Sequence, residues 1–230
     1  MKKGDIRKAE ILQTAELLFC KKGFEQTSIQ DILDMLNLSK GSFYHHFVSK
    51  ESLLETICQK RAEEAYTAVQ NEFGKAGDPI SKLNQLLSAV IPIEKERLAF
   101  ILMLLPVFSR PEGQSIKTAY SNALALQFHD AVETVIQEGC RNDTMYCTDS
   151  DIASEICLSL VNQLWIRIYD KILEYEKNNQ FTEPSELLHI TDQYRIAIEK
   201  VLSAPFGSVE LINFPILRSI IDQIHAHRVQ

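Results

Sequence analysis

The sequence predicts an all-α protein, with a small N-terminal domain of three helices followed by a larger helical domain. Apolar residues recur at helical spacing along most of the 230 residues, and the alternating pattern typical of strands is missing. Glycine and proline fall where the expected helices end or begin. With 45% hydrophobic residues, the chain can bury a small core and a second, larger one.

The first expected helix covers 7–22 and ends at two lysines and Gly23. The next segment, 27–47, is the most informative part of the chain. Thr27 is expected to cap a short helix, and Gln30 to complete a capping box with it. Asn37 tolerates the left-handed backbone conformation that a sharp turn requires. One face of this helix is apolar and carries Ile29, Ile32, Leu33 and Leu36.

A second short helix is expected after the turn, with Ser39 as its N-cap. Phe43 and Phe47 lie four residues apart and are expected to face the core. The opposite face carries small, basic and aromatic residues that can reach base edges or phosphates. Two helices joined in this way form a helix-turn-helix, whose second helix enters the DNA major groove. The alternative is an ordinary helical hairpin.

The residues expected to contact DNA share polarity or small size and lie on or beside these two helices. Lys50, at the start of the next helix, is expected to contact phosphate. The adjacent histidines point about 100° apart on a helix, so they favour phosphate contact over a shared metal ion. The predicted set is Thr27, Ser28, Gln30, Ser39, Lys40, Gly41, Ser42, Tyr44, His45, His46 and Lys50.

The segment SKGSFYHHFVSKESLL, with GFEQTSIQDIL before it, resembles the DNA-binding domain of TetR/AcrR-type transcriptional regulators. The resemblance covers about residues 6–60. It implies a regulator, most often a repressor, whose second domain binds a small effector and forms a homodimer. Such a dimer binds a pseudo-palindromic DNA operator.

The charge distribution agrees with a DNA-binding N-terminal end. Residues 1–50 hold eight Lys or Arg against six Asp or Glu, whereas the remainder holds 16 against 25. A basic end on an acidic chain is typical of a nucleic-acid-binding segment. The basic residues nearest the N-terminus could form a phosphate-binding arm or a solvated end: Lys2, Lys3, Arg7 and Lys8.

The five cysteines are odd in number, show no CxxC spacing and follow no signal peptide, so reduced thiols in the cytoplasm are expected. Cys20 and Cys58 are expected in cores. Cys140 and Cys147 flank a polar loop, where a redox switch is one interpretation and unreactive thiols are the other. The longest apolar run, 98–105, is too short to span a bilayer.

Further helices are expected through the rest of the chain, at 51–73, 79–90, 94–105, 111–139, 150–178, 183–202 and 215–227. The predicted organisation is a DNA-binding domain at 1–50, a connecting helix at 51–73, an effector-binding and dimerisation domain at 74–204 and a helical extension at 205–230. Residues 152–169 and 187–201 could build a four-helix dimer interface or line the monomer core.

An effector pocket is expected in the second domain, lined by aromatic and Met residues with a polar anchor. The same residues could equally be ordinary core. The candidates are Met103, Phe108, Phe128, His129, Gln163, Trp165 and Tyr169. No dense basic cluster accompanies them, which favours an apolar or amphipathic effector over a polyanion.

No catalytic residues, metal site or cofactor are predicted. The sequence has no glycine-rich phosphate loop, HExxH or GxSxG motif, so an enzyme is not expected. The expected partners are double-stranded DNA, a small effector and a second copy of the chain, with no membrane. The alternative is a DNA-bound regulator controlled by a protein partner, and an internal cavity in the second domain would favour the effector.

Overall fold

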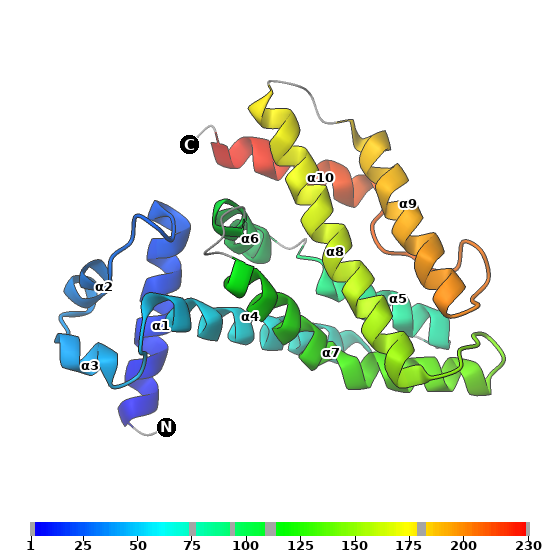
Figure 1. Ribbon diagram of the computed structural model, residues 1–230, viewed down its shortest axis with the longest axis horizontal. Helices are drawn as coiled ribbons and strands as arrows, with labels where there is room; N and C mark the ends of the chain where they lie inside the picture. Colours follow the sequence, from blue (N-terminus) through cyan, green and yellow to red (C-terminus); the bar gives the residue numbers. More distant parts are fainter. Residues whose placement is uncertain (1–2, 74–76, 93–94, 109–113, 179–182, 229–230) are drawn as a thin grey trace. The chain divides into compact units, whose positions relative to one another are not determined.

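The computed structural model describes residues 3–73, 77–92, 95–108, 114–178 and 183–228. Throughout these residues the regular secondary structure is helical, in ten helices labelled α1 to α10 (Figure 1). The prediction of an all-α fold is therefore confirmed. The chain divides into two compact units, one made of 1–62 and 96–123 and the other of 63–95 and 124–230.

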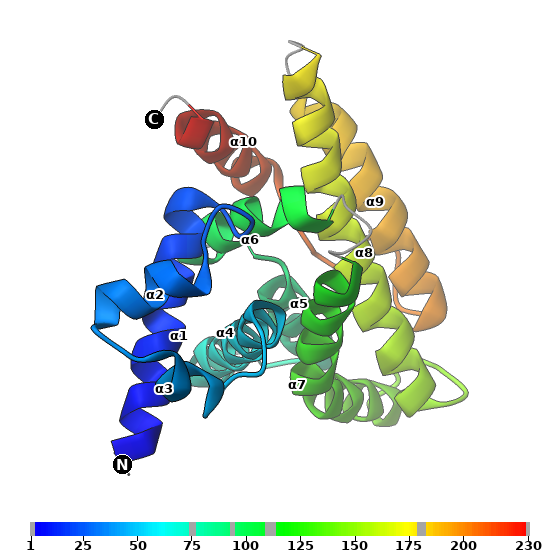
Figure 2. The ribbon, with the colours of Figure 1, turned by 60° about the vertical axis from the view of Figure 1, so that its left-hand side comes forward.

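The first unit begins with three helices, α1 (Lys3–Lys22), α2 (Ile29–Leu36) and α3 (Lys40–Tyr44), drawn in blue in Figure 2. It also takes the first half of α4 (Lys50–Phe73) and most of α6 (Lys95–Phe108). α2 packs against both α1 and α3. The side chains buried between these helices are Ile11, Phe19, Phe24, Ile32, Leu33, Phe43, Phe47, Leu53, Leu54 and Ile57.

An ion pair ties α1 to α4 within this unit. Arg61 Nε donates to Glu16 Oε1 over 2.5 Å, and both side chains are largely buried. Cys58, one turn before Arg61, is buried as predicted, whereas Cys20 on α1 is only half-buried. Burial is the main reason that the pKa of the Cys58 thiol is raised.

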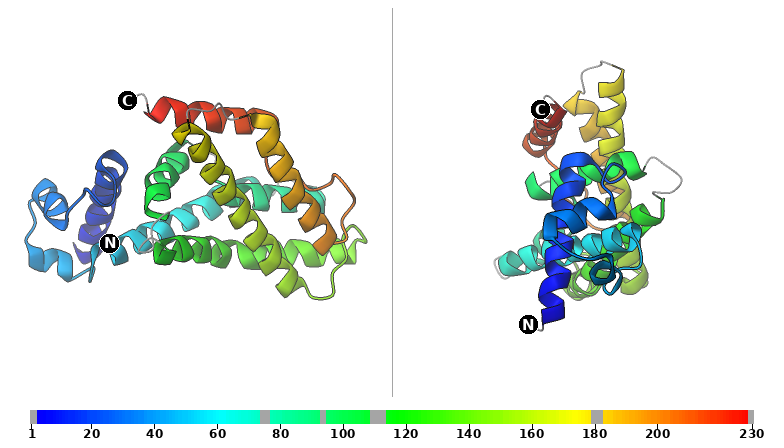
Figure 3. Two further views of the ribbon diagram at one scale, coloured as in Figure 1. Left: turned by 45° about the horizontal axis from the view of Figure 1, so that its top comes forward. Right: turned by 90° about the vertical axis from the view of Figure 1, so that its left-hand side faces the viewer.

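The second unit is built on α5 (Pro79–Val90), α8 (Ser150–Lys177), α9 (Pro184–Val201) and α10 (Phe214–Arg228). It also contains α7 (Gln114–Arg141) from Leu124 onward and the second half of α4. α8 and α9 pack side by side, as Figure 3 shows in yellow and orange. α5 packs against α8, and α10 packs against α9. The core includes Phe128, Leu158, Val161, Leu164, Trp165, Tyr169, Leu187 and Ile198.

The helix boundaries lie within a few residues of those predicted from the sequence. The exception with a physical cause is α6, which continues through Pro106 instead of ending before it. Proline in the last turn removes one hydrogen-bond donor, and the helix ends at Phe108 rather than at the proline. No helix within the described ranges is long and apolar enough to cross a membrane.

The compact units do not follow the predicted segments. The first unit extends past residue 50 to Ala62 and includes 96–123, which the sequence assigned to the second domain. The predicted extension at 205–230 belongs to the second unit. The assignment of functions to the four segments stays a prediction.

Candidate functional site

Ser28, and not Thr27, begins α2. Its hydroxyl accepts a hydrogen bond from the backbone N–H of Asp31 (3.1 Å), and Asp31 Oδ2 accepts one from the Ser28 N–H (2.8 Å). These bonds complete a capping box one residue later than predicted, with Asp31 instead of Gln30. Hydrogen bonds from Ser28, with a further one from Lys22, lower the pKa of Asp31 to about 2.

Thr27 has a structural role inside the first unit. Its side chain is fully buried, and its hydroxyl bonds to the carbonyls of Gly23 (2.9 Å) and Leu18 (3.3 Å). The prediction that Thr27 caps α2 is therefore wrong. The Thr27 hydroxyl bonds to carbonyls at the end of α1, and this interaction takes the place of a capping bond at the start of α2.

The turn of the helix-turn-helix has the predicted conformation. Asn37 adopts φ 56° and ψ 45°, in the left-handed region. Its N–H donates to Asp34 O (3.3 Å), and the N–H of Leu38 donates to Leu33 O (2.9 Å). Both bonds satisfy carbonyls at the end of α2 and redirect the chain into α3.

The helix α3 separates its apolar and polar faces. Ser39 caps it, with its hydroxyl accepting from Ser42 N over 3.4 Å. Phe43 and Phe47 are buried as predicted, with ring centroids 5.8 Å apart. The residues left on the surface include most of the predicted DNA contacts: Lys40, Gly41, Tyr44 and His45 are exposed, and Ser42 and His46 are half-exposed. Such a face can meet DNA without disturbing the core.

Another predicted contact, Gln30, lies on α2, and the two predicted histidines lie close to each other. Gln30 is exposed on α2, and its amide donates to Asp34 Oδ1 over 2.7 Å. The rings of His45 and His46 meet edge to face, with centroids 4.9 Å apart. The structure therefore places both histidines on one side of the unit.

Lys50 makes contacts that the sequence did not predict. Its ammonium donates to the carbonyls of Phe24 (2.8 Å) and Thr27 (3.1 Å) and lies 4.2 Å from the centroid of the Phe24 ring. The start of α4 is thereby tied to the loop between α1 and α2. An ammonium group has three N–H donors, so one remains beyond these two bonds.

The predicted effector residues are divided between the two units. Met103 is buried in the first unit, and the Phe108 side chain lies outside the described part of the structure. Gln163 is exposed and donates to Ser159 Oγ over 3.2 Å.

Two of the aromatic candidates belong to the core of the second unit. The Trp165 indole N–H donates to Asn162 Oδ1 (3.1 Å), and the Tyr169 hydroxyl donates to Pro92 O (2.7 Å). Both side chains are almost fully buried. Their polar groups are satisfied within the protein, which is how buried polar groups are normally found.

Phe128 packs on a residue that lines a cavity, and the sequence did not indicate this cavity. Its ring packs edge to face on Tyr66, with centroids 5.2 Å apart. Tyr66 lines a cavity of about 380 Å³ in the second unit, together with Gln70, Leu86 and Ala131. The volume is in the range of small-molecule sites. The i, i+4 spacing of Tyr66 and Gln70 places them on one face of α4, but the cavity depends on how α4, α5 and α7 pack.

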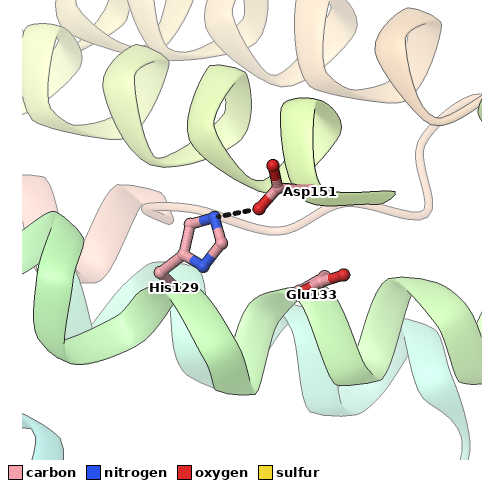
Figure 4. A group of neighbouring side chains, drawn as sticks. All are labelled: His129, Glu133 and Asp151. Carbon is pink, nitrogen blue, oxygen red and sulfur yellow. Dashed lines mark ion pairs between the residues drawn. The ribbon is translucent and has the colours of Figure 1, made fainter. Parts of the chain in front are cut away.

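His129 belongs to a cluster of three polar side chains in the second unit. His129 and Glu133 lie one turn apart on α7, and Asp151 comes from the first turn of α8 (Figure 4). The three can offer ligand atoms within 4.8 Å of one another. His129 Nε2 lies 3.2 Å from Asp151 Oδ1, and Glu133 Oε1 accepts from Ser150 Oγ over 3.1 Å. These interactions connect α7 to α8.

Comparison with known proteins points to one family. The family model described as "Bacterial regulatory proteins, tetR family" matches residues 11–57, which contain α2 and α3. The HTH-type transcriptional regulator YerO of Bacillus subtilis (strain 168) is 32% identical over 145 residues, covering 57% of this chain and 50% of the relative. The HTH-type transcriptional repressor KstR2 of Mycolicibacterium smegmatis is 31% identical over 97 residues, covering 42% and 47%.

The chain thus spans about half the length of these curated relatives. A solved structure of a TetR-family transcriptional regulator from Mesorhizobium loti MAFF303099 aligns over 88% of this chain and 99% of its own, with a TM-score of 0.57 and 18% identity. That likeness shows that the fold extends beyond the helix-turn-helix. The relatives are named as regulators of transcription and not as enzymes. Residues 11–57 therefore carry the DNA-binding segment of the TetR family of bacterial regulatory proteins.

Proposed function

We propose that this protein is a repressor that binds a pseudo-palindromic DNA operator as a homodimer in the cytoplasm and is released by a small effector. The observation that carries the proposal is α3 with the residues just after it: Phe43 and Phe47 are buried, while the small, basic and aromatic residues of α3 face outward. A recognition helix needs this division, because its outer face must reach base edges while its inner face holds it on the domain.

The support for a dimer comes from α8. Ile152 is 52% exposed and Ile156 is 40% exposed, one turn apart on the same face. Large apolar side chains grouped on a surface favour association with another protein. In a two-fold dimer this face of α8 would meet its own copy, as the sequence analysis expected for this helix.

DNA binding is tested by footprinting on an operator selected from random sequence. Two protected half-sites with centres roughly 34–36 Å apart are expected, because two recognition helices related by a two-fold axis reach successive turns of the major groove. Light scattering should give the mass of a dimer at the same concentration. A monomer that protects a single asymmetric half-site would contradict the proposal.

The exposed residues of α3 are expected to set operator preference. Lys40→Ala and Ser42→Ala should change the ranking of operator variants, each by about 1–3 kcal/mol at the affected base pair. Binding titrations against a panel of single-base variants measure this effect. Lys21→Ala is the matched control, since Lys21 is an exposed lysine at the end of α1 and not on α3. If Lys40, Ser42 and Tyr44 can all be replaced without any change in affinity, α3 is not the recognition helix.

The cavity beside Tyr66 is the proposed effector site. Its lining is two apolar side chains, one tyrosine and one amide, without a charged residue among them. This lining favours an uncharged or amphipathic small molecule, whose polar group Gln70 could bind. α4 carries Tyr66 and Gln70 and also carries Lys50, which contacts the loop before α2. A ligand that displaces α4 would therefore alter the DNA-binding unit.

The coupling is tested by calorimetry with a ligand identified in a thermal-shift screen. Ligand affinity should be about 5–150-fold weaker when operator DNA is bound, because coupling between two sites is reciprocal. Ala131→Phe should fill the cavity and abolish ligand binding while leaving operator affinity unchanged. Equal ligand affinities with and without operator would show that this ligand does not control DNA binding.

The second candidate function is control by a protein partner in place of a small molecule. The exposed Ile152 and Ile156 could bind a different protein in place of a second copy of the chain. Ile156→Asp distinguishes the two cases. Loss of the dimer assigns this face to self-association, whereas an unchanged dimer leaves it open to another partner.

A further inference from the structure

The loop between α7 and α8 brings two cysteines together. Cys140 is in the last turn of α7, and Cys147 lies seven residues later in the loop that leads to α8. Their sulfur atoms are 3.8 Å apart, within hydrogen-bonding distance of a thiol pair. Both residues are half-exposed, so a small reagent can reach them from solvent.

Backbone hydrogen bonds of the loop hold the two sulfur atoms close together. The N–H of Asn142 donates to Glu138 O (3.0 Å), and the N–H of Thr144 donates to Gly139 O (2.9 Å). Asp143 between them has φ 54°, in the left-handed region. These features turn the chain back on itself directly after Cys140, as at other helix C-termini.

Packing holds the second half of the loop in place. Met145 is buried against Gly139, where an added Cβ would lie only 3.0 Å from the methionine side chain. The N–H of Tyr146 donates to Leu202 O at the end of α9 (2.7 Å). Cys147 is therefore held near Cys140 by the contacts of the two residues that precede it.

We propose that Cys140 and Cys147 are a reversible redox modification site, which a low-molecular-weight disulfide converts to an intramolecular disulfide. One thiolate attacks the reagent, forms a mixed disulfide and releases one thiol. The neighbouring sulfur then attacks the protein sulfur of that mixed disulfide and releases the second thiol. The cysteine pair loses two electrons and two protons, and the reagent is reduced to two thiols.

The required movement is small. A disulfide needs the sulfurs about 2.05 Å apart, so each must move by less than about 1 Å from the present 3.8 Å. Burial, followed by the contact with Cys140, raises the pKa of Cys147 to about 11. Cys147 is therefore a thiol at neutral pH and reacts slowly with a reagent in solution, so the proximity of Cys140 is what makes this pair selective.

The other cysteines differ from this pair. Cys58 and Cys157 are fully buried, and burial raises the pKa of Cys157 to about 12. Cys20 is half-buried like the pair, and the charges that act on its thiol are those of Glu16 and Arg61. It therefore provides the matched control for a half-buried cysteine on a helix.

The test is to equilibrate the full chain with mixtures of oxidised and reduced glutathione and to measure its intact mass after acid quenching. The expected product has lost two hydrogens and carries no glutathione. Trypsin cleaves after Arg141, between the two cysteines, so the disulfide should join peptides 118–141 and 142–167. Fragmentation of the joined peptides should place the bond at Cys147 and not at Cys157. Reduction with dithiothreitol should restore the original mass.

Three variants complete the test. Cys140→Ser and Cys147→Ser should each lose the internal bond and carry one glutathione instead, whereas Cys20→Ser should behave as the wild type. Circular dichroism establishes that each variant is folded. Glutathione adducts without an internal bond in the wild type, a bond from Cys147 to Cys157, or five unmodified thiols would each overturn the proposal.

Discussion

Ending the chain after Ala204 is expected to unfold the second unit. The removed segment contributes six buried apolar side chains: Val209, Leu211, Ile212, Leu217, Ile220 and Ile221. Each fully buried side chain of this kind contributes about 1.5–3 kcal/mol, so their loss is on the order of 10 kcal/mol. That loss is comparable to the whole stability of a domain, which is about 5–15 kcal/mol.

The truncation would also leave polar groups without partners. Glu199 is almost fully buried and accepts hydrogen bonds from the N–H groups of Gly207 (2.9 Å) and Val209 (3.1 Å) as well as from Arg195. The amide of Asn84 on α5 donates to Ser208 O over 2.9 Å. A buried carboxylate that loses such donors destabilises the fold further.

Thermal unfolding followed by circular dichroism measures the truncated chain, and point variants give a graded result. Leu217→Ala should cost about 2–5 kcal/mol, because its side chain is fully buried on α10. Phe214→Ala is the control on the same helix, since that side chain is 49% exposed and its loss should cost much less. A truncated chain with an unchanged melting temperature would show that the segment is dispensable.

The apolar face of 215–227 was predictable because helical spacing needs only local sequence. Leu217, Ile220 and Ile221 recur on one face, and the structure buries them. Ile216 is half-buried, and the Ile224 side chain is outside the described residues. The same pattern predicts that this face packs on the second domain or across a dimer, but the bonds that join the segment to the second unit, such as that between Asn84 and Ser208, are long-range and do not follow from local sequence.

The candidate DNA interface shows the same limit. The αL turn at Asn37 and the inward phenylalanines follow from residue type and spacing, and both predictions are confirmed. Thr27 and Ser28 are equally good caps by composition. The choice between them depends on the carbonyl of Gly23, which lies within reach of Thr27 only after α1 and α2 have packed.

The proposed effector site was the least predictable part of the chain. Aromatic residues in helices are usually core, and Trp165 and Tyr169 are core here. A cavity is a space left between helices, so its lining depends on crossing geometry and not on residue type. Tyr66 and Ala131, which line it, are 65 positions apart in the sequence.

Replacing Lys50 by alanine is expected to lower both the stability of the DNA-binding unit and its affinity for every DNA sequence. The change removes a charged donor from the carbonyls of Phe24 and Thr27, together with the contact between the ammonium and the Phe24 ring. Hydrogen bonds to charged groups contribute about 1.5–3 kcal/mol, and the half-buried position of Lys50 favours the lower part of that range. The loop before α2 would lose its tie to α4.

The effect on DNA follows from the third N–H of the same ammonium. If it donates to a phosphate, Lys50→Ala should weaken binding to all sequences alike and lower the salt slope by about one. Chemical denaturation measures the stability, and binding at several salt concentrations measures the slope. Lys40→Ala separates the two effects, because Lys40 is exposed on α3 and its loss should change operator affinity without changing stability. An unchanged stability of Lys50→Ala would show that the bonds to Phe24 and Thr27 contribute nothing. An unchanged salt slope would restrict Lys50 to holding the loop and leave phosphate binding to other basic residues.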